Sequence, residues 1–290
     1  MPFLDRLKTL LATKKKVNIQ SRFELSGDPF IGRMSKVYIA RDKATGQTVA
    51  VKLLDPKKWA EFEGRFKGLE KPSEGEIAAQ INHPYVCKTL EHGLTTEGAP
   101  YLVMEVLGVS LASAIAAGEV ILAGRRLKYI TQVAEALCAV HKCGFIHRDV
   151  CPRNLLFTED GEALKLTDFG LSVPATGRFL EPGNRTGTPG YMAPELLRLQ
   201  RTDQRLDVFA FGMTVYEMFA FEPPWLRDSS GTAAVGYSTP PIDIRKYRPQ
   251  INPRLAQAIM NLVQPELAKR TPTIHQFLQV IRRIDQEDVE

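Results

Sequence analysis

Residues 147–154 read His-Arg-Asp-Val-Cys-Pro-Arg-Asn, and residues 168–170 read Asp-Phe-Gly. Within these two stretches, Asp149 is a carboxylate suited to receiving a proton. Asn154 and Asp168 carry the hard oxygen ligands that Mg²⁺ prefers in proteins. A proton acceptor close in sequence to two such ligands indicates phosphoryl transfer, in which metal ions and positioned groups act on a phosphate.

Length and composition indicate a folded, intracellular protein. The chain has 290 residues and a hydrophobic content of 44%, which is enough to bury a large core and excludes disorder as its main state. Its four cysteines show no paired spacing and are interpreted as thiols in a reducing compartment. No stretch reaches the roughly 18 apolar residues of a membrane span, and the first residues lack a secretory signal. We therefore expect a cytoplasmic protein.

The formal net charge of +5 is concentrated at the beginning of the chain. Residues 1–22 contain six basic side chains and one acidic side chain, whereas the remainder contains 32 of each. Binding to nucleic acid requires clustered excess cations that replace phosphate counterions. We expect no nucleic-acid-binding surface on the body of the protein.

The same first segment has apolar residues at helical spacing, at Phe3, Leu4, Leu7, Leu10 and Leu11. A basic amphipathic segment either docks its apolar stripe on the folded body or lies on an anionic membrane surface. We expect docking on the body, with weak membrane-surface contact through residues 1–16 as the alternative.

The pattern of the chain changes from strands to helices after its first third. Short apolar alternations at 37–40 and 48–52, joined by a turn at 43–47, predict antiparallel strands. Residues 74–81 predict a helix, and two further strands are expected around 86–90 and 101–106. The remaining periodic stretches predict helices over 127–141, 207–221, 253–263 and 274–284.

The spacing of His147 to Asn154 and then to Asp168 resembles that of the protein kinase family. The resemblance extends over about residues 23–285 and implies an α+β, two-lobed fold, with an antiparallel sheet and one main helix in the N-lobe and a helical C-lobe. The implied division is a basic amphipathic segment 1–22, an N-lobe 23–104, a hinge 105–108, a C-lobe 109–285 and a tail 286–290.

The resemblance also implies the catalytic residues. Lys52, in Val49-Ala50-Val51-Lys52, would hold the phosphates of ATP, and Glu74 would hold that lysine, with Glu76 as the nearby competitor. Asp149 would accept or orient the substrate proton, and Asn154 and Asp168 would bind Mg²⁺, with Mn²⁺ as an alternative. Cys151 stands where many serine/threonine kinases have a lysine, so Arg153 is expected to take over its contact with phosphate.

The phosphate-covering loop departs most from the family pattern. Residues 30–37 read Phe-Ile-Gly-Arg-Met-Ser-Lys-Val, so that only the middle glycine of the family's three remains. Phe30 would either cover the nucleotide or fold under the loop. The nucleotide-binding residues implied by the resemblance are Gly32, Val37, Ala50, Lys52, Met104, Glu105, Leu107 and Leu156.

A second group of residues is expected to support the site. Residues 187–195 resemble the end of an activation segment, and Glu195 should pair with Arg270. Asp207 would anchor the catalytic loop, and His147 and Phe169 would pack beneath it. Arg148 would receive a phosphorylated residue of the segment. Its hydroxyl candidates are Ser172, Thr176, Thr186 and Thr188.

The expected function is transfer of the γ-phosphoryl group of Mg-ATP to serine or threonine of protein substrates, including the chain's own activation segment. The expected partners are protein substrates and ATP. Two alternatives remain: a pseudokinase scaffold, suggested by Phe30, Ser35 and Cys151, and a small-molecule kinase of similar fold. The full activation segment favours a protein substrate.

Overall fold

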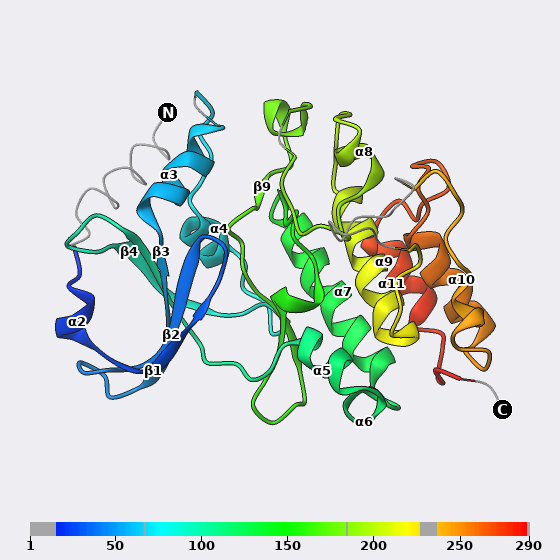
Figure 1. The fold of residues 1–290 in the computed structure, drawn as a ribbon, viewed down its shortest axis with the longest axis horizontal. Helices are drawn as coiled ribbons and strands as arrows, with labels where there is room; N and C mark the ends of the chain where they lie inside the picture. Colours follow the sequence, from blue (N-terminus) through cyan, green and yellow to red (C-terminus); the bar gives the residue numbers. More distant parts are fainter. Residues whose placement is uncertain (1–15, 67, 184, 227–236, 289–290) are drawn as a thin grey trace. The chain divides into compact units, whose positions relative to one another are not determined.

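The computed structural model describes residues 16–66, 68–183, 185–226 and 237–288 (Figure 1). The chain divides into two compact units. The sheet unit contains the residues up to Glu70 together with Lys88–Val106, and the helical unit contains Lys71–Cys87 together with the residues from Leu107 onward. None of the helices among the described residues is long and apolar enough to cross a membrane.

The sheet unit is built on five antiparallel strands in the order β1-β2-β3-β5-β4. These are β1 (Phe23–Ile31), β2 (Ser35–Asp42), β3 (Thr48–Leu54), β4 (Thr89–Leu94) and β5 (Pro100–Met104). Val37 lies opposite Lys52, and Ala50 lies opposite Met104. Because opposite residues and residues two apart share a face, these four side chains lie on one face of the sheet.

The other face of the sheet carries the core of this unit. Ala40, Val49, Val51, Tyr101 and Val103 pack there with Ile19 and Phe23. Alternation along each strand therefore separates a structural face from the face that holds the predicted nucleotide-binding residues of β2, β3 and β5.

The prediction of a strand over 86–90 was wrong in its position. Val86 forms an isolated bridge with Leu166 of the helical unit, and the N–H of Cys87 donates to the Leu166 carbonyl at 2.8 Å. The chain enters the sheet only at Thr89, where β4 begins. The backbone hydrogen bonds of 86–87 are thus satisfied outside the sheet.

Residues 17–22 are packed against the sheet, although they were predicted to belong to the basic N-terminal segment. The N–H of Val17 donates to Leu94 and the N–H of Thr96 donates to Val17, each at 3.0 Å. The short helix α2 (Ile19–Arg22) follows, and Arg22 pairs with Asp42 at 3.0 Å and with Glu91 at 2.7 Å. The apolar stripe at 3–11 lies outside the described residues.

Helix α3 (Pro56–Gly64) in the sheet unit was not predicted. Asp55 accepts hydrogen bonds from the N–H groups of Lys57 and Lys58, and Pro56 occupies the first helical position. An Asp followed by Pro is a helix-start signal, and it would have identified this element.

The helical unit contains the long helices of the protein (Figure 1). Its α-helices are α4 (Glu74–Gln80), α5 (Leu111–Ala117), α6 (Glu119–Leu122), α7 (Arg126–Lys142), α8 (Pro194–Leu197), α9 (Arg205–Ala220), α10 (Pro253–Leu262) and α11 (Ile274–Ile281). Two strand pairs accompany them: β6 (Phe145–Ile146) with β9 (Val173–Pro174), and β7 (Leu155–Phe157) with β8 (Leu164–Leu166). Helix α9 is buried along almost its whole length, as a helix that is apolar on all sides should be.

The division into units differs from the expected N-lobe 23–104. Helix α4 falls with the helical unit because Ile77, Ala78 and Ile81 are buried in the core of that unit together with Val86. The later boundary, between Val106 and Leu107, lies within the expected hinge 105–108.

The expected tail 286–290 also differs, because Glu287 and Asp288 are tied to the helical unit. Glu287 is 8% exposed and lies 3.5 Å from the guanidinium of Arg126, which is fully buried. Arg126 also donates from Nε to the Met218 carbonyl at 2.9 Å. Asp288 pairs with Arg248 at 2.5 Å. Residues 287–288 are therefore bound to the start of α7 and to Arg248, and Arg126 itself joins α7 to the end of α9.

We predict that Glu287→Gln lowers the free energy of unfolding by about 3–5 kcal/mol, because it removes the negative charge of a buried ion pair with Arg126. The glutamine still accepts the N–H of Leu127, so the change isolates the charge. Urea denaturation measures the effect. Glu266→Gln, in an exposed pair with Lys269, should cost less than about 1 kcal/mol. Equal losses in the two variants would contradict the assignment.

Candidate active site

The carboxylate of Asp149 is held from two sides. Its Oδ1 accepts the N–H of Thr188 at 2.8 Å and the hydroxyl of Thr188 at 2.7 Å. Its Oδ2 accepts Nδ2 of Asn154 at 2.9 Å. Asn154 and Thr188, which are 34 positions apart in the sequence, therefore hold the same carboxylate. These bonds fix the orientation of the Asp149 carboxylate.

The loop that carries Asp149 is anchored by Asp207 of α9. Asp207 is fully buried and accepts the backbone N–H groups of His147 and Arg148, each at 2.8 Å. His141, on α7, lies 2.8 Å from the same carboxylate through Nε2. Arg148 adopts the left-handed conformation with a φ of 67°, which a non-glycine residue holds only when its surroundings impose it.

Asp207 remains ionised in this buried position. Burial alone would raise its pKa, but the hydrogen bond and charge of His141 and the N–H of His147 outweigh burial and lower the pKa of the carboxyl. His141 was not among the predicted site residues. Its only sequence signal is its position on the apolar helix just before the catalytic loop.

His147 is a packing residue with a defined tautomer. Its Nδ1 accepts the N–H of Asp149 at 3.3 Å, so that its Nε2 must carry the proton that it donates to the Thr167 carbonyl at 3.0 Å. The ring also contacts Phe169 edge to face, with centroids 5.0 Å apart. The imidazole thus joins the catalytic loop to residues 167–169.

Asn154 and Asp168 present oxygens that fit a Mg²⁺ ion. Both N–H bonds of the Asn154 amide point at Asp149, so its amide oxygen is directed away from that carboxylate. The Asn154 carbonyl accepts both the N–H and the hydroxyl of Thr167, which brings the next residue, Asp168, to the same place. Mg²⁺ typically binds one or two carboxylates and completes its shell with waters and substrate phosphates. The described ranges contain no cluster of three His, Cys, Asp or Glu residues able to hold a metal.

Glu74 and Glu76 have different environments. The Glu76 carboxylate accepts the N–H of Ser73 at 2.8 Å in a capping box at the start of α4. Glu74 is 6% exposed, and its Oε2 lies 3.4 Å from the position a Cβ would take on Gly170. Glu76 is therefore committed to the helix cap, and Glu74 reaches the Asp-Phe-Gly stretch.

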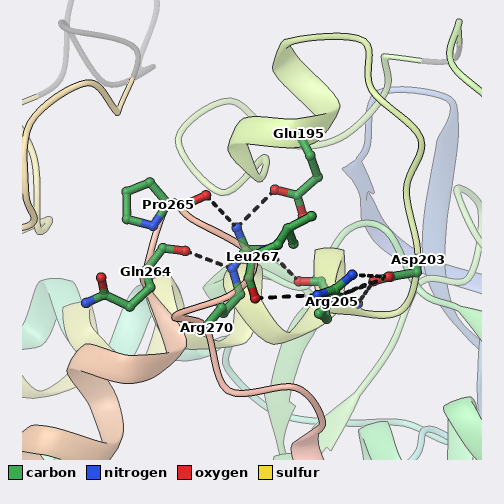
Figure 2. A network of polar contacts seen from close by, with 7 residues as sticks. All are labelled: Glu195, Asp203, Arg205, Gln264, Pro265, Leu267 and Arg270. Atoms are coloured by element: carbon green, nitrogen blue, oxygen red, sulfur yellow. Dashed lines mark hydrogen bonds and ion pairs between the residues drawn. The ribbon is translucent and has the colours of Figure 1, made fainter.

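The activation segment ends in a buried ion pair. Arg270 donates to both oxygens of Glu195, at 2.7 and 3.0 Å, and also to the carbonyls of Gln264 and Arg205 (Figure 2). Its guanidinium lies 4.8 Å from the ring centre of Phe209. These contacts fix α8, and with it the loop 187–193, to the start of α9.

Arg153 and Cys151 differ in exposure. Arg153 is exposed, and its Nη2 lies 3.5 Å from the Thr188 hydroxyl, at the rim of the Asp149 site. Cys151 is buried, and burial together with the nearby Asp149 carboxylate raises the pKa of its thiol to about 11. The thiol is therefore protonated and unreactive at neutral pH.

The remaining predicted residues lie in their own units. In the sheet unit, Gly32 forms the tight β1–β2 turn and donates to Ser35 at 2.8 Å, whereas Phe30 is 69% exposed and does not fold under the loop. Glu105 accepts the N–H of Lys88 at 2.7 Å. In the helical unit, Leu107 precedes a segment that pairs with β7, on which Leu156 lies.

A family model described as a protein kinase domain matches residues 31–281. The chain belongs to the protein kinase family. The predicted two-lobed kinase fold is thereby confirmed, with an antiparallel sheet in one unit and helices in the other.

Curated relatives agree with the family assignment. A probable serine/threonine-protein kinase of Streptomyces coelicolor is 32% identical over 74% of this chain and 32% of its own length. Serine/threonine-protein kinase PknB of Mycolicibacterium smegmatis is 34% identical over 76% of this chain and 35% of its own length. A serine/threonine-protein kinase of Myxococcus xanthus is 28% identical over 88% and 48%. The chain spans between a third and a half of the length of these relatives.

Two structural features of this kinase-family chain lie outside residues 31–281, which the family model matches. Residues 17–22, which brace the sheet, precede it, and the Glu287–Asp288 link follows it. Both use ion pairs to join a terminal segment to a folded unit.

We predict that Asp207→Asn lowers the free energy of unfolding by roughly 3 kcal/mol or more. The carboxylate accepts two backbone N–H groups, and in the variant the NH₂ group of the asparagine amide, which is itself a donor, faces one of them. Urea denaturation measures the loss. As a control, Asp243→Asn removes an exposed carboxylate that also accepts a backbone N–H and should cost less than about 1 kcal/mol.

The same variant has a pH signature. The lowered pKa of Asp207 means that its contribution is complete above the unfolded value of about 3.9 and is lost as pH falls through the folded value. The difference in stability between wild type and Asp207→Asn should therefore shrink below about pH 4. A difference that is constant with pH would contradict an ionised Asp207.

Proposed function

We propose that this chain is an active protein serine/threonine kinase that transfers the γ-phosphoryl group of Mg-ATP to protein hydroxyls. The observation that carries the proposal is the arrangement at Asp149. Its carboxylate is oriented by Asn154 and Thr188, and a threonine hydroxyl already lies 2.7 Å from Oδ1. A substrate hydroxyl at a similar distance would be within reach for proton transfer.

In this mechanism Asp149 orients the substrate oxygen and receives its proton as the bond to phosphorus forms. Its main task is to orient the hydroxyl, and proton acceptance comes late in the reaction. The bonds from Thr188 and Asn154 serve that orientation.

Asn154 and Asp168 would hold the metal through the amide oxygen and the carboxylate. When bound there, Mg²⁺ would supply positive charge that stabilises the charge developing on the phosphates during transfer. Lys52 would hold the α- and β-phosphates, and Glu74 would fix the ammonium group of Lys52. Arg153 would contribute a guanidinium to the transferring phosphate in place of the lysine that Cys151 replaces.

The finer features of the proposal are supported by sequence and chemistry. ATP would be bound by Gly32, Val37, Ala50, Met104, Glu105, Leu107 and Leu156. The substrates would be proteins, including the chain's own activation segment, and the working compartment would be the cytoplasm. Membrane contact through residues 1–16 stays a secondary prediction, because residues 1–15 lie outside the described residues. The scaffold alternative, suggested by Phe30, Ser35 and Cys151, is less well supported, because Lys52, Asp149, Asn154 and Asp168 are all present.

We predict that Asp168→Asn lowers the rate of phosphoryl transfer by about a hundredfold or more, because it removes a charged metal ligand. Asparagine also tolerates the left-handed backbone of Asp168, whose φ is 62°, so the melting temperature should stay within a few degrees. Transfer to a basic protein and thermal melting measure the two effects.

Asp285→Asn, an exposed site far along the chain, is the matched control and should retain full activity. Transfer by Asp168→Asn within tenfold of wild type, with unchanged melting, would sink the metal assignment. Loss of activity in both variants would show that the assay reports something other than Asp168.

A further inference from the structure

The tip of the loop predicted to cover the phosphates is tied to the beginning of helix α3, within the sheet unit. The Arg33 carbonyl accepts a hydrogen bond from the ammonium group of Lys58 at 3.1 Å. The next carbonyl, that of Met34, accepts the backbone N–H of Asp55 at 2.8 Å. Two consecutive carbonyls of the loop therefore point at the beginning of α3.

The beginning of α3 is itself held in place. Asp55 Oδ1 accepts the N–H groups of Lys57 and Lys58, at 3.0 and 3.1 Å, and caps the helix. Asp55 also follows directly after β3, the strand that carries Lys52. One residue thus joins the helix cap to the loop and to the strand of the lysine that is proposed to hold the phosphates.

The other side of the loop tip is fixed by strand pairing. Gly32 donates its N–H to the Ser35 carbonyl at 2.8 Å, and Ser35 lies opposite Leu54 of β3. The N–H of Gly32, the one glycine left of the family's three, is therefore used within the turn. A phosphate bound by this loop must take its hydrogen bonds from other backbone groups.

The N–H of Met34 is such a group. In a planar trans peptide unit the C=O and N–H bonds point in opposite directions. The peptide between Arg33 and Met34 directs its carbonyl at Lys58, so its N–H points away from α3. Among the described residues, no acceptor is bonded to this N–H. Unpaired backbone N–H groups of loops are the donors that bind phosphate oxygens.

We propose that Lys58 is a positioning residue for nucleotide binding: it holds the Arg33–Met34 peptide so that the N–H of Met34 donates to a phosphate oxygen of ATP. The inference rests on the proposed function, which supplies the nucleotide. A loop rich in glycine loses much conformational freedom when it is ordered around a ligand. A loop with one glycine that is already braced loses less, and the brace thereby compensates for the two missing glycines.

The expected effect on binding is moderate, because Lys58 is exposed. One hydrogen bond of this kind changes an equilibrium constant by about three- to tenfold. Lys58→Met keeps a side chain of similar length but removes the donor, and it should weaken nucleotide binding by that factor. Lys58→Arg keeps a charged donor and should restore binding to within about twofold of wild type. In transfer assays, the KM for ATP should rise in Lys58→Met while kcat stays within about twofold of wild type.

Lys57 offers a matched control. It is the neighbouring residue, it is also exposed, and its ammonium group has no hydrogen bond or ion pair among the described residues. Lys57→Met removes the same positive charge but no contact with the loop, so nucleotide binding should stay within about twofold of wild type.

The first experiment measures the dissociation constant of a non-hydrolysable Mg-ATP analogue by calorimetry in wild type and the three variants, with melting temperatures as a check on folding. A rise of about three- to tenfold in Lys58→Met alone is the expected result. An affinity of Lys58→Met equal to that of wild type, or a loss equal to that of Lys57→Met, overturns the inference and leaves the proposed function intact. A wild-type protein that does not bind the analogue removes the proposed function and the inference with it.

The second experiment locates the effect in the loop, which a general loss of stability would not do. Amide hydrogen exchange of Met34 is followed by NMR with and without saturating analogue. In wild type and Lys57→Met, exchange should slow by about tenfold or more on binding, because the N–H gains a charged acceptor. The protection should be smaller in Lys58→Met. Exchange of Met34 that does not slow when wild type binds the analogue, or that slows equally in Lys58→Met, overturns the proposal.

Discussion

The catalytic loop depends on one buried carboxylate, that of Asp207. It accepts two consecutive backbone N–H groups, of His147 and Arg148, at 2.8 Å each. Hydrogen bonds to a charged group are worth about 1.5–3 kcal/mol each, whereas a left-handed residue such as Arg148 costs about 1–2 kcal/mol. The bonds therefore outweigh the strain, and Asp149 follows in the orientation that this backbone imposes.

Helix α9 is effective as an anchor because other charges fix it in turn. At its start, the Arg205 carbonyl accepts Arg270, which is paired with Glu195. At its end, the Met218 carbonyl accepts Arg126, whose charge is balanced by Glu287. Both arginines are almost completely buried, so that removal of either acidic partner would break a buried ion pair. Exposed pairs such as Lys269–Glu266 contribute far less.

Local patterns were sufficient to predict much of the fold and part of the site. Sequence patterns located α7, α9, α10 and α11 to within a few residues, because α7, α10 and α11 have long apolar stripes and α9 is a long apolar run. Motif spacing predicted that Glu195 and Arg270 would pair, and their charged groups lie 2.7 Å apart. The strand expected at 86–90 failed because Val86 and Cys87 bond to Leu166, almost 80 residues away, and no local pattern contains that partner. The same reason applies to His141 and to Glu287, whose roles come from residues far along the chain.

The proposed activity of this arrangement is phosphorylation of serine and threonine in proteins. The most direct measurement is phosphoamino-acid analysis of a generic basic protein after incubation with the purified chain and labelled Mg-ATP. We expect label on serine and threonine that disappears when Mg²⁺ is chelated, because Asn154 and Asp168 are proposed to act through the metal. Label confined to tyrosine, or no label at any Mg-ATP concentration with the chain folded, would contradict it.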